Sequence, residues 1–333
     1  MTEETTLNNI FRRSKTIIAM MKNYLKSLLL FVVSAIAGIA QNATAQKTPE
    51  SLGWKLGTQT YSFRMFTLEE ALSKADSIGI KYVQGFPGQK IGAGIEGTMD
   101  FHMPASKIDS VLQLLKKKGI TMLSYGVVTP RTDEDWKQLF MFLKGMGLKQ
   151  FATEPEPEMM AMVSKLADEY KINVAIHNHP RPSRYWDADT LIKYTAGLSK
   201  RLGSCADVGH WVRSGLEPVA MMKKLEGRIF ELHMKDMHEK PSAEYTAFQM
   251  SRPAPGQPGT RPAPGANRPQ APAGPHDVPW GTGISNIKSI LEELKRQNFK
   301  GPMFAEYEYN WMNNAPEIAQ SIKYVKEVVS NMK

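Results

Sequence analysis

Seven polar side chains fall at or just after the ends of short apolar runs in this chain. Each run has the length of a buried β-strand, so the polar residue comes where a strand would leave its sheet. The residues are Glu154, His177, His179, Asp207, His210, His233 and Glu306. Carboxylates and imidazoles without a thiolate suit one divalent metal ion, such as Mn²⁺, Mg²⁺, Co²⁺ or Zn²⁺. A single polar residue at a strand end usually does no more than hydrogen-bond to the backbone of a loop. Seven such residues predict a metal or catalytic site.

The stretch VAIHNHP, residues 174–180, places two of these histidines at one strand end. Residues two apart on a strand point to the same face, about 7 Å from each other. One ion therefore cannot easily bind both His177 and His179. The histidine that is not a ligand is expected to face substrate or to support the ligands.

The elements that must position these residues alternate along the chain. Short apolar runs are each followed by about a dozen residues with helical spacing. The expected strands are 56–61, 81–86, 120–126, 150–154, 172–178, 203–207, 228–234 and 302–307. The expected helices are 68–78, 105–118, 133–146, 158–170, 188–202, 217–225, 287–297 and 316–332. Eight strand–helix units predict a (β/α)8 TIM barrel ahead of a doubly wound sheet, and they fill one domain, residues 46–333.

Two glycine-rich or proline-rich stretches interrupt this alternation. Residues 240–279 hold nine prolines between Pro253 and Pro279, and they follow the seventh strand. Such a composition predicts a disordered insertion in the seventh βα loop, which could cover the site. Gly92, Gly94 and Gly97 match GxGxxG, but they do not lie directly between a strand and a helix, so we expect a flexible loop rather than a dinucleotide site.

The N-terminus has the pattern of a secretory signal. Lys22 and Lys26 precede an apolar run, residues 27–40, and the small-residue sequence Ala43-Thr44-Ala45 follows it. We therefore expect residues 1–45 to be a cleaved signal peptide, with Met21 as an alternative start, and the protein to be exported to the periplasm. A retained membrane anchor is the alternative.

The overall charge and the cysteine content narrow the classes of partner. The net charge of +9 is spread over helix-like stretches without interleaved aromatic residues, which does not indicate a nucleic-acid groove. Cys205 is the only cysteine, so no internal disulfide can form. The oligomeric state is left open.

Six short motifs carry a resemblance to a known family. They are GTQTYSF at 57–63, SYGVV at 124–128, CADVGHW at 205–211, HMKD at 233–236, WGTG at 280–283 and FAEYE at 304–308. In this order the chain resembles the sugar phosphate isomerase/epimerase group of the xylose isomerase-like TIM barrels. The resemblance implies one divalent ion held by a Glu on strand five, an Asp on strand six, a His on strand seven and a Glu on strand eight.

The last three of these ligands fall on Asp207, His233 and Glu306, whereas the strand-five Glu falls on His177. Two sets of ligands are therefore possible: His177 itself binds the ion, or Glu154 on the adjacent strand supplies the missing carboxylate. We favour Glu154 with Asp207, His233 and Glu306 as the metal ligands. His177, His179, Glu306 and Lys235 are the expected catalytic residues, and His210, Tyr61 and Tyr125 the expected substrate contacts.

The resemblance implies a reaction that starts by removing a proton next to a carbonyl. Export favours an unphosphorylated carbohydrate substrate, and the leading expectation is an isomerase/epimerase that forms an enediolate. A lyase that cleaves 3-keto-glycosides by β-elimination is the alternative. An endonuclease IV-like phosphodiesterase and a non-catalytic carbohydrate-binding barrel are the weaker rivals.

Overall fold

The computed structural model describes residues 15, 17, 18, 20–29, 47–251 and 272–332. The chain divides into two units, residues 1–46 and 47–333. In the first unit the described residues are helical and exposed, and the expected signal peptide otherwise lies outside the described residues. Among the residues described, no helix is both long enough and apolar enough to cross a membrane.

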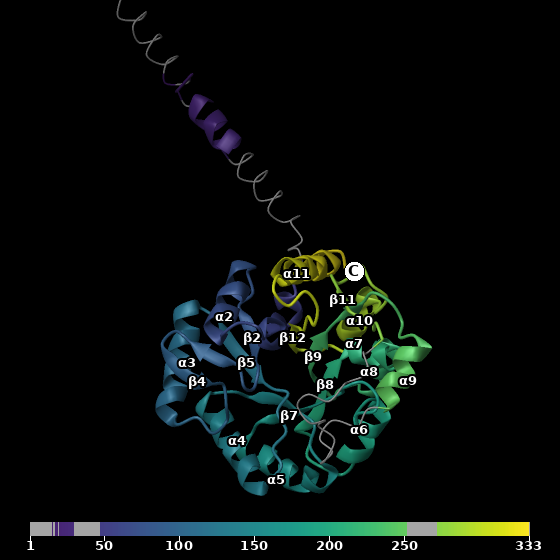
Figure 1. Cartoon of the computed structure of the whole chain (residues 1–333). Helices are drawn as coiled ribbons and strands as arrows, with labels where there is room; N and C mark the ends of the chain where they lie inside the picture. Colours follow the sequence, from purple (N-terminus) through teal and green to yellow (C-terminus); the bar gives the residue numbers. More distant parts are fainter. Residues whose placement is uncertain (1–14, 16, 19, 30–46, 252–271, 333) are drawn as a thin grey trace, which may run out of the picture. The chain divides into compact units, whose positions relative to one another are not determined.

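The second unit is built on a ring of eight parallel strands (Figure 1). In spatial order they are β5 (Thr121–Tyr125), β2 (Tyr82–Gly85), β1 (Trp54–Gln59), β12 (Gly301–Ala305), β9 (Ile229–Met234), β8 (Leu202–Asp207), β7 (Asn173–His177) and β6 (Gln150–Thr153). The ladder is interrupted between β5 and β6, where the Val128 N–H donates to the Ala152 carbonyl at 3.0 Å. The predicted (β/α)8 barrel is therefore confirmed.

Helices surround the strands on the outside of the ring (Figure 1). They are α2 (Leu68–Ser77), α3 (Ala105–Lys118), α4 (Asp133–Gly145), α5 (Met160–Tyr170), α6 (Ala188–Thr195), α8 (Pro218–Lys224), α10 (Ile287–Arg296) and α11 (Ala315–Ser330). Local signals set their ends, as where Thr67 and Glu70 form a capping box at the start of α2. Large apolar side chains such as Trp136, Phe140 and Phe151 are fully buried between helices and strands.

Three short elements differ from the sequence expectation. The GxGxxG stretch is a small antiparallel hairpin, β3 (Lys90–Gly92) and β4 (Ile95–Thr98), rather than an open loop. Glycine is required at Gly92, where φ is +79° and a Cβ would lie 2.8 Å from the Thr67 hydroxyl. A short helix, α7 (Val208–Arg213), also follows β8 directly, because the Asp207 side chain accepts the N–H of His210 and caps it.

The proline-rich insertion has regular structure at both ends. Its first part contains α9 (Ala243–Ser251), and its far end contains β11 (Asp277–Val278), which pairs with β10 (Asp236–Met237). Met250 of α9 lines a pocket together with Arg181 and Trp186 from the loop after β7. The expected disorder of residues 240–279 does not extend to these ends, and residues 252–271 lie outside the described part of the chain.

Candidate metal and catalytic site

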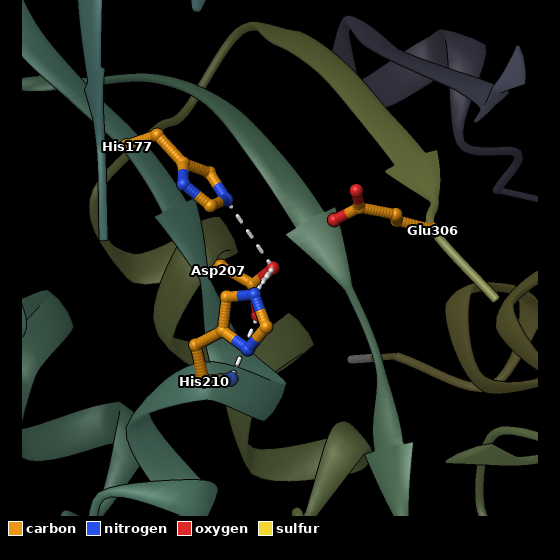
Figure 2. Close-up of side chains that lie close together, drawn as sticks. All are labelled: His177, Asp207, His210 and Glu306. Carbon is orange, nitrogen blue, oxygen red and sulfur yellow. Dashed lines mark hydrogen bonds and ion pairs between the residues drawn. The ribbon is translucent and has the colours of Figure 1, made fainter. Parts of the chain in front are cut away.

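The polar residues predicted from the sequence come together at the carboxyl ends of the barrel strands. His177 ends β7, Asp207 ends β8, and Glu306 follows β12 directly. Figure 2 shows the side chains of these three residues and of His210 converging from separate elements. This convergence arises because parallel strands of a barrel all end on the same face.

Asp207 lies at the centre of the cluster and is fully buried. Its Oδ2 is 2.8 Å from Lys235 Nζ, and 3.5 Å from the Nε2 atoms of both His177 and His210. His233 Nδ1 lies 3.8 Å from the same oxygen. One carboxylate oxygen therefore faces an ammonium group and three imidazoles.

Glu306 faces Asp207 across the cluster. Its Oε2 lies 2.9 Å from His233 Nδ1 and 2.7 Å from Lys235 Nζ. Lys235 is completely buried, and it lies 3.3 Å from a third carboxylate, Glu308. The ammonium group of Lys235 thus bridges Asp207 and Glu306.

Glu154 does not lie with the other expected metal ligands. Its Oε1 contacts His177 Nδ1 at 3.0 Å, accepts the backbone N–H of His179 at 3.1 Å and makes a short contact with His179 Nδ1. Ser183 donates its hydroxyl to the other oxygen at 3.0 Å. Since His177 presents its opposite nitrogen, Nε2, to Asp207, the structure places His177 between Glu154 and the cluster.

The donor set fits a divalent cation. Three buried atoms of the cluster lack a hydrogen bond of acceptable geometry to any described residue, namely His177 Nε2, His233 Nδ1 and Glu306 Oε2. Ligand atoms of His177, Asp207, His210 and Glu306 all lie within 4.8 Å of one another. Nitrogen and carboxylate donors of this kind are those of Mn²⁺, Mg²⁺, Co²⁺ and Zn²⁺ sites.

Burial and charge act in opposite directions on the acids of the cluster. Burial raises the pKa of Asp207 and of Glu306, but the Lys235 ammonium together with the neighbouring imidazoles outweighs it and holds both values below their usual range. In turn, burial lowers the pKa of Lys235, and the Asp207, Glu306 and Glu308 carboxylates more than reverse this effect. The cluster is therefore ionised at neutral pH.

The imidazoles of His177 and His210 have opposite charge states. Burial lowers the pKa of His177, but Asp207 and Glu154 raise it to about 9. Burial also lowers the pKa of His210, and here the nearby Lys235 and Arg213 cations lower it further. In the metal-free protein at neutral pH, His177 is thus cationic and His210 is neutral.

A second ion-pair network, which the sequence did not predict, borders the cluster. Arg213 of α7 makes a short contact with Glu308, and its Nη2 lies 3.4 Å from Asp277 Oδ2. Asp277 also accepts the backbone N–H of Glu308 at 3.1 Å. Since Asp277 belongs to the far end of the insertion, these contacts join the insertion to the site.

The two tyrosines predicted as substrate contacts have different surroundings. Tyr61 is half-buried and its ring lies 4.8 Å from that of Phe86 and 5.6 Å from that of Trp311, in loops that follow β1, β2 and β12. Tyr125 is fully buried, and its hydroxyl donates to the Met99 carbonyl at 3.2 Å. The structure therefore gives Tyr125 a role in core packing and does not support the substrate contact.

Two buried residues beside the cluster were also missed. Gln84 Oε1 lies 2.6 Å from His233 Nε2, and Glu231 accepts from the Gln84 amide at 2.7 Å. Strand alternation could have revealed Glu231, because residues 231 and 233 share one face of β9, residue 235 continues the alternation just after the strand, and all three are ionisable. Gln84 has no comparable signal in the sequence.

The high pKa of His177 predicts a pH dependence of stability in the metal-free protein. Below pH 6.5 the imidazole is protonated in both the folded and the unfolded chain, and its stabilisation is complete. As the pH rises towards 9 the unfolded chain loses this proton first, so about 3 kcal/mol of unfolding free energy is lost.

Denaturant unfolding with chelator at pH 6, 7.5 and 9 measures this loss. The His177→Gln variant should show a smaller decrease than the unmodified protein over the same range. Equal decreases in the two proteins would contradict the assigned charge of His177.

A family model identifies the family of this chain, and solved structures share its fold. Residues 64–328 match the family model described as xylose isomerase-like TIM barrel. No curated protein matches the chain. Among solved structures, an uncharacterized protein from Parabacteroides distasonis ATCC 8503 is 29% identical with a TM-score of 0.61, over 83% of this chain and 99% of that chain.

Two more distant structures share the fold. A xylose isomerase-like TIM barrel protein from Mycobacterium smegmatis in complex with magnesium is 12% identical, with a TM-score of 0.58 over 83% of this chain and 97% of that chain. D-Psicose 3-epimerase with D-tagatose from Clostridium cellulolyticum H10 is 10% identical, with a TM-score of 0.56 over 83% and 99%. The family resemblance predicted from the motifs is thus confirmed, and the chain belongs to the xylose isomerase-like TIM barrel family.

Proposed function

We propose that this protein is an exported, divalent-metal-dependent enzyme that removes a proton next to a carbonyl of an unphosphorylated carbohydrate, as an isomerase or epimerase. The observation that carries the proposal is the convergence of Asp207, His233, Glu306 and His177 at the carboxyl end of the barrel, where three buried donor atoms make ion-pair contacts within the cluster but no hydrogen bond of acceptable geometry. This end of a TIM barrel is where active sites lie.

The proposed ligands of the metal are Asp207, His233, Glu306 and His177. This set revises the expectation that Glu154 binds the ion, since Glu154 contacts the far nitrogen of His177. A carboxylate in that position orients the imidazole and raises its basicity. When bound, the cation would polarise the substrate carbonyl and its neighbouring hydroxyl.

His179 is the proposed general base. Its side chain is 39% exposed, and its Nδ1 contacts the Glu154 carboxylate, which leaves Nε2 to accept a substrate proton. Lys235, between Asp207 and Glu306, would stabilise negative charge on the substrate oxygen. Glu306, on the other side of the cluster from His177, would exchange a proton at the neighbouring carbon.

Aromatic side chains beside the cluster support a carbohydrate substrate. Tyr61, Phe86 and Trp311 lie close together, and the Arg64 guanidinium lies 3.8 Å from the centre of the Trp311 ring system. Ligand sites combine such apolar and aromatic surface with a few placed polar groups. We therefore infer that these rings contact the face of a sugar.

The second candidate is a lyase that forms the same enolate and then expels a β-substituent. The observation that favours it is the imidazole of His177, at the position where the resemblance to the epimerases implies a glutamate. In this candidate His177 is not a ligand of the metal, and its imidazole, which Asp207 and Glu154 favour in the cationic form, donates a proton to the departing oxygen, whereas an ionised carboxylate cannot.

Activity assays in D₂O separate these candidates. With Mn²⁺, Mg²⁺, Co²⁺ or Zn²⁺, an isomerase or epimerase incorporates deuterium into ketohexoses, and a lyase releases the aglycone of 3-keto-glycosides. Asp207→Asn and Glu306→Gln should each lose at least about 100-fold in turnover and most bound metal, because each removes a charged ligand. Asp109→Asn, at an exposed position on α3, is the matched control.

Full turnover in the presence of chelator would refute metal dependence. Sugar binding without turnover, unchanged in Asp207→Asn, would indicate a carbohydrate-binding barrel instead. Cleavage of abasic DNA would indicate an endonuclease IV-like enzyme.

Lys235→Met tests whether the ammonium group and a metal ion share the same carboxylates. Without metal, the variant should be about 3 to 5 kcal/mol less stable, because Asp207 and Glu306 lose their buried counter-charge. Added Mn²⁺ should then raise its melting temperature more than it does for the unmodified protein, while turnover stays low. Lys117→Met, at an exposed position on α3, is the control, and an identical response of both variants would contradict the assignment.

Export predicts a processed N-terminus. The full chain expressed with its leader should yield a periplasmic protein that begins at Gln46, and a version without residues 1–45 should stay in the cytoplasm. N-terminal sequencing of fractionated cells measures this. An unprocessed chain in the membrane fraction would show a retained anchor instead.

A further inference from the structure

A layer of buried polar residues lies beside the proposed metal ligands, inside the barrel. Glu231 precedes His233 by two residues on β9, and Gln84 comes from β2 on the other side of β12 and β1. Both side chains are completely buried. None of the proposed catalytic steps uses either residue.

The hydrogen bonds of Glu231 fix the orientation of the Gln84 amide. Gln84 Nε2 donates to Glu231 Oε1 at 2.7 Å and to the Ser124 hydroxyl at 3.1 Å, while Gln150 Nε2 donates to the other carboxylate oxygen. Both oxygens of the Glu231 carboxylate thus accept from side-chain amides, so the amino end of Gln84 faces it. The carbonyl end of Gln84 must then point the other way.

That carbonyl end meets a ring nitrogen of His233. Gln84 Oε1 lies 2.6 Å from His233 Nε2, and because a carbonyl oxygen only accepts, Nε2 must carry the hydrogen. The other nitrogen, Nδ1, is the atom that lies 2.9 Å from Glu306 Oε2 and 3.8 Å from Asp207 Oδ2. A metal ion binds the nitrogen lone pair, so the hydrogen must be on Nε2 for Nδ1 to serve as the ligand atom.

We propose that Glu231, acting through Gln84, is a positioning residue that holds the proton of His233 on Nε2 and so keeps Nδ1 available to a divalent cation. The position of the proton depends on the donor-to-acceptor direction of these hydrogen bonds. Reversing the Gln84 amide would present a donor to Nε2 and move the proton to Nδ1. The purpose of this row of hydrogen bonds rests on the metal-dependent function proposed above. The position of the proton, however, is a property of the metal-free protein.

Four variants test the hydrogen bonds that link Glu231, Gln84 and His233. Glu231→Met removes the acceptor with little change in volume, and Gln84→Leu removes the link itself. The exchange variant, which combines Gln84→Glu with Glu231→Gln, restores the polarity, because the carboxylate introduced on β2 would accept both from the amide introduced on β9 and from His233 Nε2. Ser124→Ala is the matched control, since it removes the other partner of the Gln84 amide and leaves Glu231 in place.

Two measurements apply to each protein. Nitrogen-15 NMR of the histidine rings, with chelator present, shows which nitrogen of His233 carries a proton. Titration calorimetry with Zn²⁺ and Mn²⁺ gives the affinity for the cation. We expect a protonated Nε2 in the unmodified protein, Zn²⁺ affinity about 10- to 100-fold weaker in Glu231→Met and Gln84→Leu, and recovery of most of that loss in the exchange variant.

An unprotonated Nε2 in the unmodified protein overturns the proposal, and this measurement does not depend on whether any variant folds. Exchange-variant affinity as weak as that of Glu231→Met also overturns it, because the effect would then be one of packing. If the unmodified protein binds neither cation, but Glu231→Met still moves the proton from Nε2, the positioning role stands and the metal-dependent function fails.

Discussion

A single buried ammonium group makes this arrangement of strand ends possible. Asp207 and Glu306 come from different strands of the barrel, and two ionised carboxylates in an environment of low dielectric constant repel each other strongly. Lys235 lies within hydrogen-bond distance of both and is completely shielded from water. Because all three residues lie at strand ends, the charge balance and the geometry of the barrel depend on each other.

The fold and the centre of the site could be predicted from the sequence, for a physical reason. Strand and helix periods are local properties, and a parallel barrel brings all strand ends together whatever the exact register. Asp207, His177, His233 and Glu306 were therefore identified from their places at the ends of apolar runs. The exact ends were less certain, as in α6, which ends at Thr195 rather than at residue 202.

Contacts between side chains of non-adjacent elements could not be predicted in this way. Gln84 and Arg213 matter because of what lies opposite them in space, and neither has a distinctive neighbourhood in sequence. Tyr125 shows the converse case, since it lies in a family motif but its hydroxyl is satisfied inside the core. The role of Glu154 depended on which nitrogen of His177 it would meet, and this follows only from the packing of β6 against β7.

The two ends of the insertion are held together by the pairing of β10 with β11. The folding of the barrel therefore does not depend on how long the insertion is. Asp236 and Met237 pair with Val278 and Asp277, and the Asp236 carboxylate accepts the backbone N–H groups of Gly281, Gly283 and Ser285. The chain between these anchors leaves and returns at neighbouring points, and the entropy of closing such a loop grows only slowly with its length. Evolution can therefore lengthen or shorten this segment, and a reporter domain could be grafted into it, with little effect on the folding of the barrel beneath.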